Sequence, residues 1–217
     1  MLPKYFERVV TFFLSEKRFL ALLYARLILS LVVFFYSSFI VFFLLLLISL
    51  MVCLRFRGTF NGGSDYMTMV ILLSMCISNI SESNASYLLA GLCYIAIQVT
   101  LSYFVAGVIK AFKSSWRNGT SLSIFLTSSP YPLSPAVTGI IKNRKLMMGA
   151  SWAVIAFECS APLVFFIDGF PPLFLAVAVL FHVSTVYVFG LNRFLFAWLS
   201  AYPALYFLST FSLRSFH

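Results

Sequence analysis

LILSLVVFFYSSFIVFFLLLLISLMVCL, residues 27–54, runs for 28 residues without an aspartate, glutamate, lysine or arginine. At a rise of about 1.5 Å per residue, roughly 20 apolar residues cross the hydrocarbon core of a bilayer. The stretch therefore predicts a single spanning helix with room for tilt. A cleavable secretory signal has an apolar region of only about 7–15 residues, so this stretch is too long to be one.

The composition excludes a water-soluble globular domain. Of the 217 residues, 62% are hydrophobic and 10% are charged, whereas soluble domains average about 45–50% apolar and about 25% charged residues. Further apolar runs lie at residues 66–80, 85–108, 146–167, 173–190 and 194–213. These runs predict an all-α fold, a polytopic helical membrane bundle of five to six transmembrane helices over residues 27–213. Residues 66–80 are either a short span or a re-entrant segment.

Two segments outside the spans are polar enough to lie at a membrane surface. Residues 1–26 mix charged with large apolar side chains, which is typical of an amphipathic helix in the headgroup plane or of a helix packed outside the membrane. Residues 111–145 are predicted to form the longest extramembrane loop, partly at the interface. The positive-inside rule does not fix the orientation, because its answer depends on whether residues 66–80 cross the bilayer.

The formal net charge of +9 does not indicate nucleic-acid binding. Basic residues of membrane proteins usually lie in loops, where they orient the chain and contact anionic headgroups. The lipid bilayer of the cell membrane is therefore the expected partner. No metal site is expected, since the cysteines stand singly, with no metal-ligand spacing, at Cys53, Cys76, Cys93 and Cys159.

Lys110 closes the apolar run 85–108 and is the first candidate functional residue. Tyr103, Gly107 and Lys110 are spaced i, i+4, i+7, so they share one face of a helix. A buried neutral amine at this position could accept a proton as a general base. The alternative is a lysine at a helix end that extends its ammonium group to the interface.

Glu158 and His182 are the other ionisable residues inside apolar runs, where charge is costly. Glu158 needs a cation, and Lys110 and Arg193 are the candidates; the result is either a structural ion pair between helices or a catalytic group. His182 begins a stripe with Thr185, Phe189 and Arg193 that is predicted to face inward. Because no second histidine or carboxylate stands at i+3 or i+4, a hydrogen-bonded histidine is favoured over a metal ligand.

Several motifs, taken in order, carry a family resemblance. Tyr103-Phe-Val-Ala-Gly-Val-Ile-Lys110, followed by Trp116-Arg-Asn-Gly-Thr120, resembles the signature of HTTM, the horizontally transferred transmembrane domain family. The similarity extends over roughly residues 60–210 through Asn61-Gly-Gly-Ser-Asp65, Phe181-His182, Leu191-Asn192 and Tyr202-Pro-Ala204. The family includes the vitamin K-dependent γ-glutamyl carboxylases and the bacterial membrane proteins that mature the sporulation-delaying peptide toxin. The Asn61–Asp65 turn and the Trp-x-x-Gly-Thr segment are more similar to the bacterial branch.

The resemblance implies roles for individual residues. Lys110 occupies the position of the carboxylases' catalytic lysine, which deprotonates a reduced quinone; with oxygen, that quinone gives a base strong enough to remove a glutamate γ-proton. A reduced, vitamin K-like quinone is thus the implied cofactor, and Glu158 and His182 would tune or orient Lys110. The expected substrate or ligand contacts are Asn61, Asp65, Tyr103, Trp116, Asn192 and Arg193.

Two departures from the carboxylases narrow this expectation. Ile109 stands where the animal enzymes are expected to have a second lysine, and the 217 residues contain no counterpart of the propeptide-binding domain. They favour a compact core that matures a small bacterial peptide toxin, alone or with a separate partner subunit. The alternative is a non-catalytic scaffold or immunity protein that binds a peptide or a partner, in which Lys110 would tolerate arginine or glutamine. A small transporter is disfavoured, since the chain shows no internal symmetry.

Overall fold

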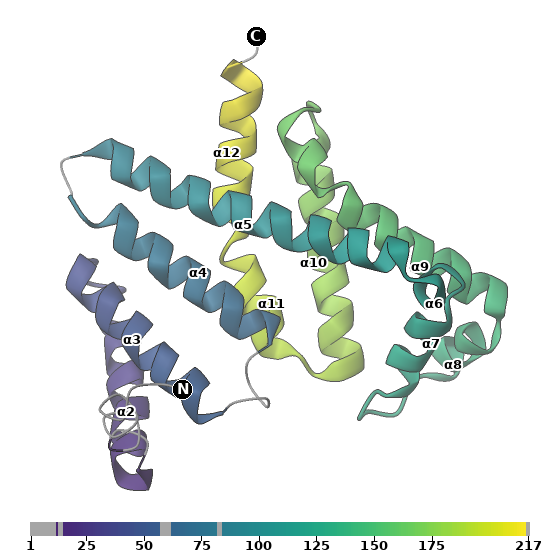
Figure 1. The fold of residues 1–217 in the computed structure, drawn as a ribbon, viewed down its shortest axis with the longest axis horizontal. Coiled ribbons are helices and arrows are strands. Elements are labelled where there is room, and N and C mark those ends of the chain that lie inside the picture. Colours follow the sequence, from purple (N-terminus) through teal and green to yellow (C-terminus); the bar gives the residue numbers. More distant parts are fainter. Residues whose placement is uncertain (1–11, 13–14, 57–61, 82–83, 216–217) are drawn as a thin grey trace. The chain divides into compact units, whose positions relative to one another are not determined.

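The computed structural model describes residues 12, 15–56, 62–81 and 84–215, and every regular element in these ranges is a helix. The chain divides into two compact units, residues 1–95 and 96–217, with helix α5 (Ala85–Phe112) running through the boundary (Figure 1). The predicted all-α helical class is therefore confirmed.

Unit 1 contains α2 (Glu16–Val32), α3 (Phe39–Arg55), α4 (Gly63–Ser78) and the first part of α5. The Phe19 ring of α2 packs edge-on against Phe56, which follows α3, with ring centroids 5.5 Å apart. Ser74 Oγ of α4 donates a hydrogen bond of 2.6 Å to the Gly91 carbonyl of α5. Aromatic packing and a buried hydroxyl thus join consecutive helices in this unit.

The single helix predicted over residues 27–54 is wrong. Helix α2 ends at Val32 and α3 begins at Phe39, and the Ser38 side chain caps α3 by accepting a hydrogen bond from the Val41 N–H. Serine favours N-caps because its hydroxyl satisfies a backbone donor of the first turn, and the valine and aromatic residues before it are weak helix formers. Because residues 27–54 contain no charged residue, their hydropathy does not mark the break between the two helices.

The predicted N-terminal segment, residues 1–26, does not end at a helix boundary, because α2 continues through residue 26 to Val32. Its part from Glu16 onward belongs to α2, whereas residues 1–11 and 13–14 lie outside the described residues. An orientation in the headgroup plane stays a prediction.

Among the residues that the structure describes, four helical segments are long and apolar enough to cross a membrane: Ala85–Phe112, Arg144–Phe165, Phe170–Phe189 and Asn192–Phe211. They correspond to the runs predicted from the sequence at 85–108, 146–167, 173–190 and 194–213. The helices α3 and α4, with 17 and 16 residues, are shorter. Whether α4, which contains most of residues 66–80, crosses or re-enters stays a prediction.

Unit 2 begins within α5 and contains three short helices in the segment predicted as a loop, residues 111–145. They are α6 (Ser114–Arg117), α7 (Thr120–Thr127) and α8 (Pro135–Lys142). The remaining elements are α9 (Arg144–Cys159), the 3₁₀ helix η1 (Ala161–Phe165), α10 (Phe170–Phe189), α11 (Asn192–Leu199) and α12 (Tyr202–Ser215). Pro162 lies in the first turn of η1, where its missing N–H ends the α-helical pattern.

A close approach at Gly107 joins α5 to α9. A Cβ atom at Gly107 would lie 2.7 Å from the Cys159 nitrogen and 2.9 Å from Glu158 Cβ. Distances of this kind require a residue without a side chain, so glycine sets the separation of the two helices. Gly107 stands one turn before Lys110, and the contact therefore brings Lys110 close to Glu158.

A second contact holds the short helices against α9. Ser151 Oγ of α9 donates a hydrogen bond of 2.5 Å to the Trp116 carbonyl of α6. Gly119 has a φ of 80°, and a Cβ atom there would lie 2.7 Å from the Met147 backbone, so both the conformation and the space require glycine. The turn between α6 and α7 is thereby fixed on the first half of α9.

The Gly107 contact predicts a selective effect of one added methyl group. Gly107→Ala should lower the free energy of unfolding by about 1–3 kcal/mol, because the methyl group overpacks against the α9 backbone. Gly149→Ala, on α9, is the matched control: nothing lies within 4 Å of its added Cβ, so better helix propensity should leave it neutral or slightly stabilised. Thermal unfolding in detergent measures both, and equal stability of the two variants would contradict the contact.

Candidate functional site

The ion pair between Lys110 and Glu158 is the centre of the candidate site. Lys110 Nζ of α5 donates to Glu158 Oε1 at 2.6 Å and to Oε2 at 2.5 Å on α9. The two side chains are 18% and 4% exposed. Of the two cations that the sequence offered to Glu158, the structure places Lys110 beside it.

Trp116 gives Lys110 a second contact. The Lys110 Nζ atom lies 5.2 Å from the centroid of the indole ring, within the range in which a cation is attracted to an aromatic face. The carboxylate and the indole together hold the ammonium group inside unit 2. Lys110 therefore does not extend its charge away from the protein as an interfacial lysine would.

A buried hydrogen-bonded chain of three side chains lies in the same unit. Tyr103 Oη of α5 is 2.7 Å from His182 Nε2 of α10 and 2.7 Å from Tyr202 Oη of α12. All three residues are less than 6% exposed. One phenol thus links three helices through polar contacts, and its direction of donation follows the histidine tautomer.

Two polar atoms close to this chain have no hydrogen-bond partner in the described part of the protein: His182 Nδ1 and Trp198 Nε1. Their rings are neighbours, with centroids 5.1 Å apart. An unsatisfied buried polar group typically costs about 1–3 kcal/mol, and native proteins contain few of them. The indole N–H is a donor only, so an oxygen acceptor is the chemistry that would satisfy it.

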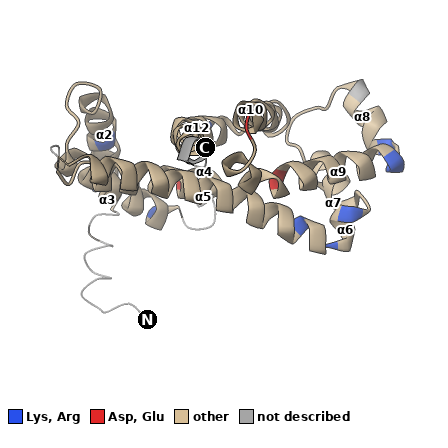
Figure 2. Ribbon diagram, turned by 90° about the horizontal axis from the view of Figure 1, so that it is seen from above, with Lys and Arg blue, Asp and Glu red and all other residues tan. Residues whose placement is uncertain are grey.

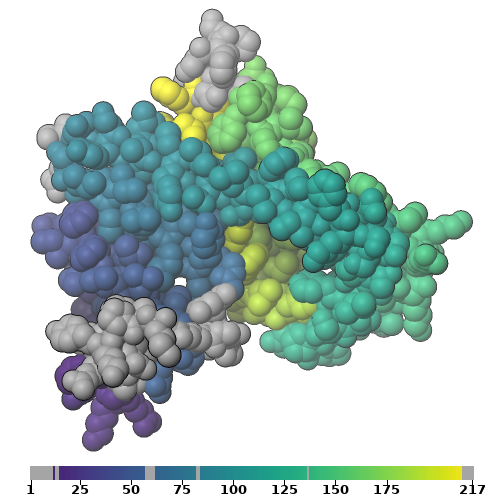
Figure 3. Space-filling view, in the orientation of Figure 1, coloured from purple at the N-terminus to yellow at the C-terminus, as the bar shows by residue number. Residues whose placement is uncertain are grey.

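These residues surround one cavity of about 510 Å³ built entirely from unit 2. In Figure 3 this face of unit 2 is hollowed between the teal atoms of α6 and α7 and the yellow-green atoms of α10 and α11. Most of the lining is apolar or aromatic; its polar and aromatic residues include Tyr103, Lys110, Trp116, Glu158, Phe181, His182, Phe194 and Trp198. Both its volume and its lining, which is mostly apolar with a few polar groups, are typical of a small-molecule pocket.

The structure brings five of the predicted site residues together, and they all line this cavity: Tyr103, Lys110, Trp116, Glu158 and His182. Asn192 and Arg193 are exposed on α11 and are not part of its lining. Asp65 is buried in the first turn of α4 in unit 1, and Asn61 lies outside the described residues.

The predicted inward stripe is correct only within α10. His182, Thr185 and Phe189 line the cavity, but α10 ends at Phe189 and Arg193 belongs to α11. The spacing of i+11 from His182 to Arg193 assumed one continuous helix, and the chain instead turns at Gly190.

Trp198 and Tyr202 were not predicted as site residues. Both are aromatic residues with a polar atom inside an apolar run, and such residues usually find a hydrogen-bond partner when they are buried. That property was the available signal. Their contacts depend on how α10, α11 and α12 pack, which sequence spacing does not give.

Within the described residues, no group of three His, Cys, Asp or Glu side chains could hold a metal ion. The model of one protein family, the HTTM domain, matches residues 75–210. No curated protein and no solved structure matches the chain. The matched region contains the ion pair, the hydrogen-bonded chain and every residue of the cavity.

Breaking the ion pair one side at a time should cost more than removing it whole. Lys110→Met leaves the Glu158 carboxylate in an apolar wall, and the single variant should lose up to about 3 kcal/mol of unfolding free energy. The double variant Lys110→Met/Glu158→Met should recover part of that loss. Lys113→Met, a change at an exposed lysine three residues on, is the control. If the double variant loses as much unfolding free energy in detergent as Lys110→Met and Glu158→Met lose together, the two side chains are not coupled.

Proposed function

The chain belongs to the HTTM domain family, and from that premise we propose that this integral membrane protein is an enzyme, or the membrane subunit of one, with Lys110 as general base. One observation carries the proposal: the Lys110–Glu158 pair lies in the wall of an apolar cavity large enough for a ligand. Ionisable residues within apolar spans are costly and are functional candidates by default. The adjoining cavity gives a ligand room to lie beside this pair.

The pair gives Lys110 a way to become a base. Moving one proton from Lys110 Nζ to a Glu158 oxygen converts two charged groups into a neutral amine and a neutral carboxylic acid. Apolar surroundings disfavour both charged forms, so the transfer removes charge from the cavity wall. The neutral amine can then accept a proton from an acidic group of a ligand, while Glu158 holds the proton that Lys110 has lost.

We propose a reduced quinone as the cofactor, since the lining fits a flat apolar ring that bears oxygen atoms. Aromatic side chains, among them Phe181 and Phe194, supply contact surface. His182 and Trp198 also line the cavity, and their Nδ1 and Nε1 atoms have no partner among the described residues; we propose that a rotation of these side chains brings the nitrogens to the cavity surface to hold a ring oxygen. When bound, a reduced quinone would supply two electrons and an acidic ring hydroxyl.

The proposed substrate is a small peptide, and the proposed setting is the maturation of a bacterial peptide toxin. The support is the resemblance of the Asn61–Asp65 and Trp116–Thr120 segments to the toxin-maturation branch. A separate subunit would then supply the peptide-binding surface that the carboxylases carry in a domain of their own.

Replacing Lys110 tests the base directly. In cells that make the cognate peptide, Lys110→Gln and Lys110→Arg should each lower formation of the modified peptide at least about 100-fold, which is the lower end of the effect of a general base. Arginine keeps the charge but cannot be deprotonated in a protein. Mass spectrometry of the peptide, at equal membrane abundance, gives the result.

Lys113→Gln is the matched control and should leave product formation unchanged, because Lys113 is exposed and does not line the cavity. Full product from Lys110→Arg or Lys110→Gln would reject the base and favour the scaffold or immunity role.

Tryptophan fluorescence tests the cofactor separately. Trp116 and Trp198 line the cavity, whereas Trp152 is 46% exposed and does not. Menadiol should therefore quench the fluorescence of the detergent-solubilised protein in a saturable manner, and Trp152→Phe should keep that quenching. His182→Ala should raise the half-saturating concentration roughly five- to tenfold, through the loss of one hydrogen bond. Quenching that never saturates, or that His182→Ala leaves unaltered, would mean partitioning into the micelle and no cavity site.

A further inference from the structure

We propose that a second, smaller cavity of unit 2 binds the phosphate headgroup of an anionic phospholipid. This cavity of about 190 Å³ lies between α7, α8 and the start of α9, and it shares no lining residue with the larger one. Its polar lining residues are Asn118, Thr120, Ser123, Lys142 and Arg144.

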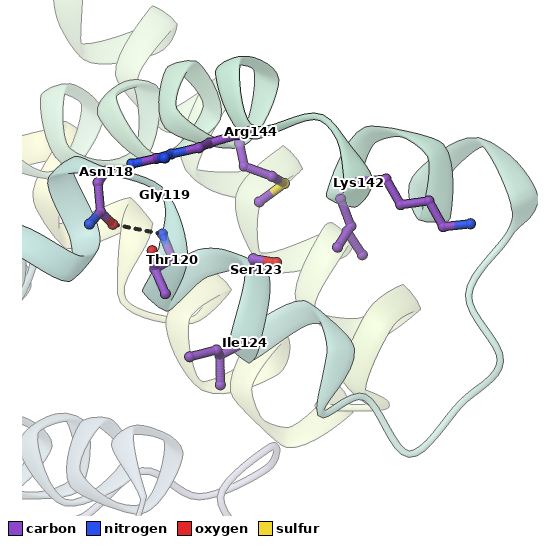
Figure 4. Close-up of a pocket in the computed structure, with 9 residues that line it drawn as sticks. Asn118, Gly119, Thr120, Ser123, Ile124, Lys142 and Arg144 are labelled. Carbon is purple, nitrogen blue, oxygen red and sulfur yellow. Dashed lines mark hydrogen bonds between the residues drawn. The ribbon is translucent and has the colours of Figure 1, made fainter.

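The lining chemistry suits a phosphodiester. Arg144 extends over the turn at Asn118–Gly119–Thr120, whereas Lys142 extends away from that turn (Figure 4). A guanidinium group matches phosphate oxygens with two parallel donors. Asn118 Oδ1 accepts from the Thr120 N–H at 3.0 Å, which leaves the Asn118 amide as a donor group. No carboxylate lines the cavity.

The charge of the surrounding segment has one sign. Residues 111–157 contain five basic residues and no acidic one; the basic residues are Lys113, Arg117, Lys142, Arg144 and Lys145. Figure 2 shows lysine and arginine residues gathered at the end of unit 2 formed by α6–α9. Each basic residue close to an anionic membrane surface adds about 1 kcal/mol of attraction.

The position of the cavity indicates a lipid as the source of the phosphate. Arg144 is the first residue of a segment long and apolar enough to span a membrane, so it stands where that segment meets the headgroup region. Apolar side chains continue outward from the polar residues: Ile124 and Met147 line the cavity, and Ile124 is 63% exposed. A soluble anion would use only the polar residues, whereas a phospholipid also uses the apolar ones.

The test compares lipid binding to the full chain in detergent by native mass spectrometry. Dioleoylphosphatidylglycerol should bind the wild-type protein with roughly tenfold preference over dioleoylphosphatidylcholine. Arg144→Gln should weaken phosphatidylglycerol binding roughly tenfold, as expected for the loss of charge-assisted hydrogen bonds. Arg144→Lys keeps the positive charge but lacks the two parallel guanidinium donors, so its affinity for phosphatidylglycerol should be intermediate.

Lys145→Gln is the matched control, since it removes the same charge one residue away from a position outside the lining; it should change binding less than twofold. Equal weakening by Arg144→Gln and Lys145→Gln would overturn the site in favour of general surface charge. Equal binding of the two lipids would overturn the headgroup preference. Full displacement of the lipid by inorganic phosphate at equal concentration would show a free-anion pocket instead. Circular dichroism and size-exclusion profiles of Arg144→Gln that match those of the wild type show that the variant is folded.

Discussion

Lys110 and Glu158 can lie in an apolar cavity wall because each is the partner of the other. Removing a carboxylate or an ammonium group from water costs several kcal/mol, and only close pairing offsets that cost. The pairing in turn requires α5 and α9 to approach closely, which Gly107 permits. The Ser151–Trp116 hydrogen bond then fixes α6 so that the indole covers the lysine. The buried ion pair thus depends on Gly107, Ser151 and Trp116, which set the positions of α5, α9 and α6 around it.

The fold class was predictable because it follows from composition and run length, both of which the bilayer constrains strongly. The helix break between Val32 and Phe39 was not, because an apolar run has the same hydropathy whether it forms one helix or two. The helices of residues 111–145 were missed for a different reason. Short helices are marginal alone, and contacts with α9, such as Ser151 with Trp116, stabilise the first of them.

Residues of the candidate site were predictable where an unusual residue type and its place within a single helix both pointed to them. A lysine at a helix end and a glutamate inside an apolar run are conspicuous, and periodicity placed Tyr103 on the same face as Lys110. Arg193 lies beyond the turn at Gly190, where α10 has ended, so its spacing from His182 did not predict its position. Trp198 and Tyr202 needed the packing of α10–α12 before their contacts with His182 and Tyr103 could be known.

A purely structural ion pair would gain nothing from the cavity beside it. Apolar residues of similar volume often replace buried ion pairs without loss of stability, so a pair that only joins α5 to α9 has an apolar substitute. Here Tyr103 and Lys110 stand seven residues apart on one face of α5, roughly 10 Å along the helix axis, and both line the cavity. Tyr103 lies beside His182, to which it is hydrogen-bonded, and Lys110 lies beside Glu158, so polar groups border the cavity at two levels of α5. A ligand that contacted both levels would need polar atoms at two places and an apolar body between them, because most of the lining is apolar or aromatic.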